Sequence, residues 1–162
     1  MLADISKADP LFAAVALRYF NPIGAHESGL IGESPNDIPN NLMPYLLKVV
    51  VGKLPHLNVF GTDYNTPDGT GVRDYIHVMD LAEGHLSAMN FCDQVGSGFH
   101  VFNLGTGAGT SVLELVAAIE AASGCSVKTV MAPRRDGDAE KLLAVPDKAN
   151  RDLNWKAKRN IQ

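Results

Sequence analysis

Hydrophobic residues recur along this chain in short segments of two kinds. A continuous apolar run predicts a buried strand at residues 13–20, and further strands are expected at 57–60, 74–78, 99–104 and 126–131. Helical spacing of apolar residues, with capping or breaking residues at its ends, predicts helices at 3–8, 42–51, 80–91, 111–123 and 147–153. Because strands and helices alternate, the pattern indicates the α/β fold class.

Two segments of this pattern carry further expectations. The helix expected at 80–91 has Leu81, Ala82, His85, Leu86 and Met89 on one face, the stripe that an amphipathic helix buries. Residues 21–41 form a long loop with three Gly, three Pro and four Asn. Loops of this length without structure of their own are uncommon and are often functional.

Composition narrows the class of protein without identifying it. The 162 residues are 46% hydrophobic and 20% charged, which is typical of a globular domain with a real core. The net charge of -4, with no run of basic residues, argues against a nucleic-acid partner. No stretch approaches about 18 apolar residues, so we expect no membrane span, and the first 20 residues show no secretory pattern.

Cys92 and Cys125 are the only cysteines, and they form no CxxC pair. Two isolated thiols do not make a disulfide framework, so we expect reduced, buried thiols in a cytoplasmic protein. The five histidines are scattered without metal-binding spacing, so the sequence predicts no metal site. No Tyr is followed four positions later by Lys, so the chain has no recognisable proton-transfer pair of its own.

Residues 105–110 (GTGAGT) follow a predicted strand and precede a predicted helix, the context of a dinucleotide fingerprint. The match fails because the third glycine is at position 109. The next predicted strand, 126–131, also ends without the acidic residue that binds ribose hydroxyls. We interpret the segment as a glycine turn, not as an NAD phosphate site.

Several blocks of sequence, taken together, are distinctive of one group of enzymes. They are RYFNP with GAH (18–22, 24–26), PNNLMPY (39–45), VFGTDY (59–64), DGTGVRDYIHV (68–78), NLGTG (103–107) and RRDGD (134–138). In this order the blocks resemble the UDP-glucose 4-epimerases of the extended short-chain dehydrogenase/reductase superfamily. The joint presence of IPNNLMPY and DGTGVRDYIHV is closest to the epimerases.

The resemblance implies that residues 1–162 are the C-terminal, UDP-sugar-binding portion of a cytoplasmic, NAD-dependent enzyme of galactose metabolism. The implied fold is the C-terminal part of an extended Rossmann-type protein, with the last sheet strands and a small α/β substrate lobe. The implied NAD-binding domain and catalytic Tyr-x3-Lys lie upstream, and both ends of the chain look cut. The isolated chain is then expected to show no epimerase activity and no stably bound NAD. Its binding of UDP is expected to be weak or absent, because exposed strand edges and an unburied face should make it poorly folded. The family is often homodimeric.

The resemblance also assigns roles to individual residues. Arg73 and Arg135 match arginines that bind the diphosphate, and Asp138 matches a carboxylate that accepts from ribose hydroxyls. The positions that match contacts to the sugar nucleotide otherwise are Asn21, Asn41, Leu42, Leu57 and Phe60, the last two at the uracil. Those that match the approach to the nicotinamide are Tyr19, Phe20 and Pro22. Leu142 stands where many relatives have a Tyr that reaches the sugar nucleotide.

Two other functions remain open at this point. The chain is compatible with a related enzyme, such as an epimerase for UDP-N-acetyl sugars or pentoses, or a dehydratase. It is also compatible with a UDP-sugar-binding module that catalyses nothing, because it contains neither an NAD fingerprint nor a Tyr-Lys pair. Without the resemblance, the arginines read as surface residues, and the asparagines and Asp138 as turn or capping residues.

Overall fold

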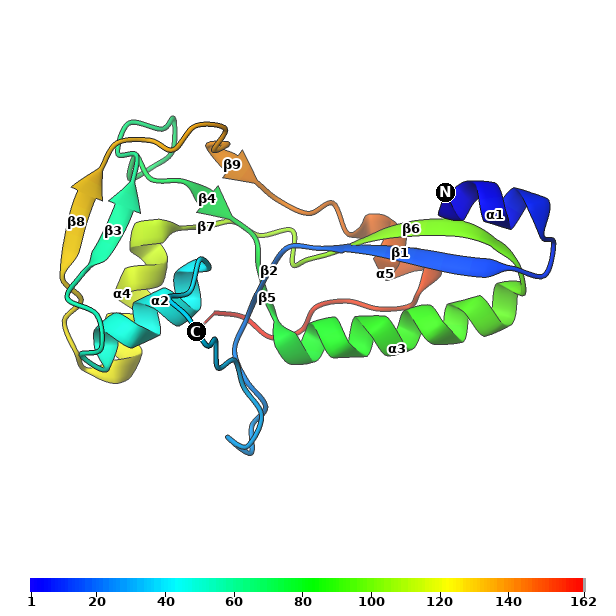
Figure 1. Ribbon diagram of the computed structural model, residues 1–162, viewed down its shortest axis with the longest axis horizontal. Helices are drawn as coiled ribbons and strands as arrows, with labels where there is room; N and C mark the ends of the chain where they lie inside the picture. The colour runs from blue at the N-terminus through cyan, green and yellow to red at the C-terminus, as the bar shows by residue number, and fades with distance from the viewer. Residues whose placement is uncertain (162) are drawn as a thin grey trace. The chain divides into compact units, whose positions relative to one another are not determined.

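A computed structural model describes residues 1–161, and the chain divides into two compact units (Figure 1). Unit 1 contains residues 1–24, 74–108 and 143–160. Unit 2 contains residues 25–73 and 109–142, together with Ile161. The chain therefore passes from one unit to the other at five places, after residues 24, 73, 108, 142 and 160.

Unit 1 is built on a parallel pair of strands that are far apart in the sequence. Strand β1 (Ala13–Tyr19) pairs with β6 (Gly98–Leu104), in register from Ala13 opposite Gly98 to Tyr19 opposite Leu104. Helix α3 (Val78–Val95) packs on this pair, and α1 (Leu2–Ala8) and α5 (Asp147–Asp152) also contact β6. In Figure 1 the two strands run between α1 and α3.

A second, shorter pair joins the ends of these elements. Strand β2 (Asn21–Ile23) follows β1 almost directly and pairs in parallel with β5 (Tyr75–His77), which leads into α3. The core of unit 1 lies between the strands, α3 and the C-terminal segment. Its buried residues are Ile76, Leu81, Ala88, Phe102, Leu104, Ala149, Leu153 and Trp155.

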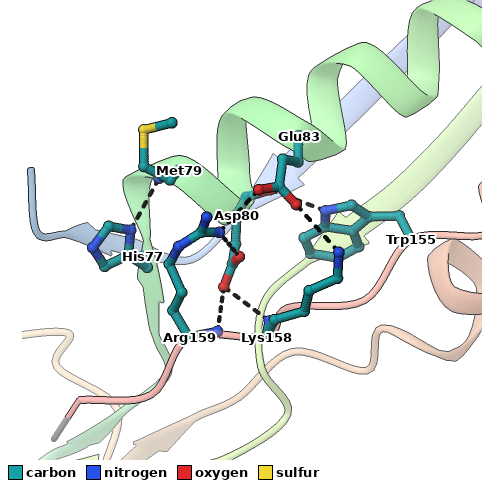
Figure 2. Close-up of polar contacts among 7 residues, drawn as sticks. All are labelled: His77, Met79, Asp80, Glu83, Trp155, Lys158 and Arg159. Atoms are coloured by element: carbon teal, nitrogen blue, oxygen red, sulfur yellow. Dashed lines mark hydrogen bonds and ion pairs between the residues drawn. The ribbon is translucent and has the colours of Figure 1, made fainter. Parts of the chain in front are cut away.

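The first turn of α3 is joined to the C-terminal segment by polar contacts (Figure 2). The ring Nδ1 of His77 accepts the amide of Met79 at 3.1 Å and caps the helix. The fully buried carboxylate of Asp80 accepts the backbone amides of Lys158 and Arg159, at 2.9 and 2.8 Å, and the Arg159 guanidinium. Because a buried carboxylate is costly unless hydrogen-bonded, these contacts fix the segment against the helix.

Unit 2 contains two small sheets and two helices. Strand β3 (Leu57–Phe60) pairs in parallel with β8 (Thr129–Ala132). Strand β4 (Val72–Arg73) lies between antiparallel β7 (Thr110–Ser111) and parallel β9 (Lys141–Leu142). The helices are α2 (Leu42–Val50) and α4 (Val112–Ser123).

Most of the elements expected from the sequence are present, and the α/β class is confirmed. Ser111 caps α4 as expected, in a capping box in which its hydroxyl accepts the amide of Glu114 at 3.0 Å. Three predictions need correction. The strand expected at 74–78 is β5, which covers only Tyr75–His77 because Val78 begins α3. The loop expected at 21–41 begins with β2, and the strand expected at 126–131 is β8, which begins only at Thr129.

The apolar stripe expected to be buried on the 80–91 helix is wrong for most of its members. Ala82 and His85 are exposed, as are Leu86 and Met89 at 62% and 65% of their surface. The buried face instead carries Asp80, Leu81, Gly84 and Ala88. Its residues are small or hydrogen-bonded, which lets α3 lie close to the strands and to the C-terminal segment. Within residues 1–161, no helix is both long and apolar enough to cross a membrane.

Gly84 tests this close approach. Alanine is ordinarily about 1 kcal/mol better than glycine inside a helix. Here its Cβ would lie 2.8 Å from Leu104 Cδ1 and 3.2 Å from Trp155 Cε2. We expect Gly84→Ala to lower the free energy of unfolding by about 1–3 kcal/mol, as overpacking does. Chemical denaturation measures this, with Asn90→Ala on the exposed face as control; equal stabilisation by both substitutions would refute the packing argument.

Candidate functional site

Four of the residues singled out from the sequence gather at strand ends in unit 2. Phe60 is the last residue of β3, and Arg135 follows β8 by three positions. Since these two strands are parallel and Phe60 pairs with Ala132, the segments that follow the two strands begin at the same end of the pair. Arg73 is the last residue of β4, and Asp138 closes a turn with its amide bonded to the Arg135 carbonyl at 3.3 Å.

Asp138 is the centre of this cluster. Its carboxylate accepts from Arg135 Nε at 2.7 Å and lies 3.5 Å from Arg73 Nη2. The Arg135 guanidinium stands over the Phe60 ring, with Cζ 5.0 Å from the ring centroid. We call Phe60, Arg73, Arg135 and Asp138 the arginine cluster.

The arginine cluster has the chemistry of an anion site beside an aromatic surface. Two guanidinium groups face one carboxylate, so one positive charge is left over in the cluster. The Arg73 side chain is only 19% exposed, and its Nη1 is oriented by the carbonyl of Val72 at 2.9 Å. Guanidinium groups bind phosphate through paired hydrogen bonds, and an exposed Phe ring can stack on a planar base.

Arg134, the neighbour of Arg135, is engaged elsewhere. Its Nε donates to Asp63 Oδ1 at 2.7 Å, and its guanidinium lies 4.1 Å from the centre of the Tyr64 ring. The hydrogen bond from Arg134 lowers the pKa of the Asp63 carboxyl, and Asp63 in turn raises the pKa of Arg134. This ion pair was not predicted from the sequence. It joins the segment that follows β3 to the segment that follows β8.

Asp68 holds the turn that leads into β4. Its carboxylate accepts the amide and the hydroxyl of Thr70, at 2.8 and 2.7 Å, and the hydroxyl of Ser111. Burial raises the pKa of Asp68, but the hydrogen bonds from Ser111 and Thr70 outweigh it, so the pKa lies below its ordinary value of 3.8. The turn therefore depends on an ionised Asp68.

Three more of the predicted residues lie in unit 2. Asn41 is at the N-cap position of α2, yet its side chain makes no capping hydrogen bond. Leu42 begins that helix and is half-buried. Leu57 is 3% exposed and lies three positions from Phe60, so the two side chains are on opposite faces of β3.

The other four predicted residues, Tyr19 to Pro22, lie in unit 1 at the end of β1 and the start of β2. The Phe20 amide donates to the carbonyl of Leu104 at 3.1 Å, and the Asn21 amide to that of Asp74 at 3.0 Å. Tyr19 is 54% exposed, with its ring 6.2 Å from that of His85.

The glycine-rich segment 105–110 is a turn, as interpreted from the sequence. The amides of Thr106 and Gly107 donate to the buried carboxylate of Asp74 at 2.9 and 2.8 Å. An internal anion thus occupies the backbone donors that a phosphate would need. The segment also leads into β7 before α4 begins, so it does not open a helix directly.

Comparison with known proteins bears on the whole chain. A family model described as GDP-mannose 4,6 dehydratase matches residues 1–162. The chain belongs to this family. Among curated relatives, the family member described here is 60% identical to "UDP-glucose 4-epimerase 2" of Arabidopsis thaliana over 98% of its length, and 57% identical to the UDP-glucose 4-epimerase of Neisseria gonorrhoeae over 100%. It spans 45% and 48% of these two proteins.

Solved structures of similar proteins agree with the fold. The UDP-glucose 4-epimerase of Stenotrophomonas maltophila, with bound NAD and formylated UDP-arabinopyranose, has a TM-score of 0.95 at 49% identity and covers 99% of the chain. That of Bifidobacterium longum, in complex with NAD+ and UDP, has a TM-score of 0.92 at 53% identity and covers 98%. The chain covers 47% of each, and the fold is the Rossmann-like α/β fold of these enzymes.

The pKa of Asp68 predicts how stability depends on pH. A group whose pKa is lowered by folding stabilises the fold above its unfolded pKa and loses that contribution as pH falls through the folded value. We expect Asp68→Asn to cost about 1–3 kcal/mol near pH 7, because an amide NH₂ would face a donor. The difference from the unsubstituted protein should shrink below about pH 4. Urea unfolding from pH 7 to 3 measures it.

Asp136→Asn is the matched control, since Asp136 is exposed in the same unit. It should change the free energy of unfolding little at any of these pH values. A difference for Asp68→Asn that stays constant down to pH 3 would contradict the role of the ionised carboxylate.

Proposed function

We propose that this chain forms the UDP-sugar-binding part of a UDP-glucose 4-epimerase, which interconverts UDP-galactose and UDP-glucose by NAD-dependent oxidation and reduction at sugar C4. The observation that carries the proposal is the arginine cluster, in which two guanidinium groups, an exposed aromatic ring and one carboxylate converge. The identity of 57–60% to proteins that bear this name supports it.

Each member of the arginine cluster suits one part of UDP. Arg73 and Arg135 would bind the diphosphate, which carries more negative charge than Asp138 and competes for the same donors. Phe60 would lie against uracil. Asp138, freed from Arg135, would accept from ribose hydroxyls, because an ionised carboxylate only accepts hydrogen bonds.

The remaining proposed contacts differ in how directly the geometry supports them. The Asn41 side chain makes no capping hydrogen bond, so helix capping does not explain this residue. Together with Leu42, it would contact the sugar nucleotide. Asn21 would do the same from unit 1. Leu57 would support the uracil pocket from the core behind β3, since it is itself buried.

We propose that NAD is bound mainly outside residues 1–162, in a part of the longer relatives that this chain does not cover. The glycine turn does not fit the cofactor's diphosphate, because Asp74 occupies its amides. We propose that Tyr19, Phe20 and Pro22, at the end of β1, lie near the nicotinamide. The catalytic Tyr and Lys are likewise proposed to lie in that part.

The physiological form we propose is a cytoplasmic homodimer of the longer enzyme, without nucleic-acid or membrane partners. The expectation that both thiols are buried is wrong, because Cys92 is half-buried and Cys125 is exposed. UDP-glucose and UDP-galactose are the proposed substrates.

The two adjacent arginines provide a test of UDP binding. Arg135→Ala removes charge-assisted hydrogen bonds to the diphosphate and should weaken binding of UDP about 10- to 100-fold. Ligand-observed NMR with the purified chain is the measurement, because binding by this portion alone is expected to be weak. Arg134→Ala is the matched control: it breaks the pair with Asp63 and should change the affinity only a few-fold.

The outcomes separate a specific site from a general electrostatic effect. Equal weakening by Arg134→Ala and Arg135→Ala would show that UDP responds only to the local charge. Absence of UDP binding in the unsubstituted chain and in the protein purified from its natural source would contradict the proposed function itself.

The catalytic part of the proposal is tested on protein from the natural source. The curated relatives predict an intact mass roughly twice 17.3 kDa. Such a protein should epimerise UDP-galactose, and the 162-residue chain alone should not. A 17.3 kDa natural protein would favour a UDP-sugar-binding module, and failure on UDP-galactose with turnover of UDP-N-acetylgalactosamine would favour a related epimerase.

A further inference from the structure

Asp74 is a fully buried carboxylate whose two oxygens are both occupied. Oδ1 accepts the amide of Thr106 at 2.9 Å and its hydroxyl at 2.7 Å. Oδ2 accepts the amide of Gly107 at 2.8 Å and the amide of Ala144 at 3.2 Å. The donors come from segments that are 32 to 70 residues away in the sequence.

The residues bonded to Asp74 share one property, which is their place beside the passages of the chain between the two units. Asp74 itself is the first residue of unit 1 after the passage at 73–74. Thr106 and Gly107 come just before the passage at 108–109, and Ala144 just after the one at 142–143. Asn21, whose amide donates to the Asp74 carbonyl at 3.0 Å, precedes the passage at 24–25.

The backbone at Gly105 lies against the Asp74 carboxylate and Ala144. A Cβ at position 105 would lie 2.7 Å from Asp74 Oδ2 and 2.4 Å from the Cβ of Ala144. Only glycine fits where these segments meet. Gly107 has a φ of +76°, a backbone conformation that residues with a side chain rarely adopt.

We propose that Asp74 is a positioning residue that fastens four of the five passages between the units to one point of unit 1. Its carboxylate holds the segments at 106–107 and 144, and its backbone holds the segment at 21. The fifth passage, at 160–161, follows Arg159, which is held by the other buried carboxylate of this unit, Asp80.

Under the proposed function, this arrangement acts on the site through its chain neighbours. Arg73 is the residue before Asp74 in the chain, and the backbone amide of Asn21 donates to the Asp74 carbonyl. This part of the inference rests on the proposed function. The fastening of the passages does not, and it can be tested without any ligand.

The test is hydrogen exchange of single backbone amides in Asp74→Asn, followed by NMR. An amide side chain presents an NH₂ to at least one of the four donors, so Thr106, Gly107 and Ala144 should exchange about tenfold faster or more. The deciding amide is that of Asn21. It donates to a backbone carbonyl that the substitution keeps, so it exchanges faster only when the passage itself is loosened.

Asp80→Asn is the matched control, because it alters the other buried carboxylate of the same unit, which accepts three hydrogen bonds from the distant segment at 158–159. It should accelerate exchange at Lys158 and Arg159 and leave Asn21, Thr106, Gly107 and Ala144 as they are. The amides of Phe102 and Leu104 in β6 report on the core, and they should change little in Asp74→Asn.

Two results would overturn the proposal. If Thr106, Gly107 and Ala144 exchange faster while Asn21 keeps its protection, Asp74 only caps the glycine turn. If every amide of unit 1, including those of β6, accelerates equally, Asp74 is a general contributor to stability. Should Asp74→Asn not fold, Thr106→Val removes one donor at 2.7 Å and should give the same pattern with a smaller increase.

A second readout separates this inference from the proposed function. If UDP binds the unsubstituted chain, Asp74→Asn should weaken it several-fold, whereas Asp80→Asn should not. If UDP binds neither the unsubstituted chain nor the protein purified from its natural source, the proposed function fails while the exchange pattern still decides the role of Asp74. Equal UDP affinity in Asp74→Asn and the unsubstituted chain would overturn the link to the site.

Discussion

Burial of the Asp74 carboxylate is the constraint on which the arrangement of several segments of unit 1 depends. A carboxylate away from water is tolerated only when donors surround both oxygens. Here the donors are supplied by the backbone and side chain of the 105–110 turn and by the backbone at Ala144. This requirement explains Gly105, which leaves space for the carboxylate.

The main alternation of strands and helices could be predicted because apolar residues mark strands such as β1 and β6 and boundary residues mark the helices, whereas the two-residue strands β4, β7 and β9 carry no such signal. The sequence did not predict which face of α3 is buried. Hydropathy favours Leu86 and Met89, but the helix packs through Gly84 and Ala88, and the value of a small residue lies in how closely a neighbour approaches. The hydropathy of the residues in a sequence gives no information on how closely neighbouring elements approach one another in the fold.

The candidate site shows the same limit. Motif resemblance selected the members of the arginine cluster, and Arg73, Arg135, Phe60 and Asp138 do lie together. Arg134 and Arg135 are chemically identical neighbours in the sequence, and only the structure separates them, because one faces Asp63 and Tyr64 while the other faces Asp138 and Phe60. Resemblance likewise gave Leu57 and Phe60 one role, although they lie on opposite faces of β3.

The parallel pairing of β1 with β6 has a consequence for synthesis of the chain. The pair can be completed only after Leu104, the partner of Tyr19, has been synthesised. About 80 residues separate the end of β1 from the start of β6. At the usual rate of about 5–20 residues per second, β1 exists for roughly 4 to 16 s before its partner has been made. During that time the backbone N–H and C=O groups on the β6 side of β1 lack their final partners, as on an exposed edge strand. The separation of the two strands in the sequence therefore leaves this edge of β1 open to incorrect pairing for several seconds of synthesis.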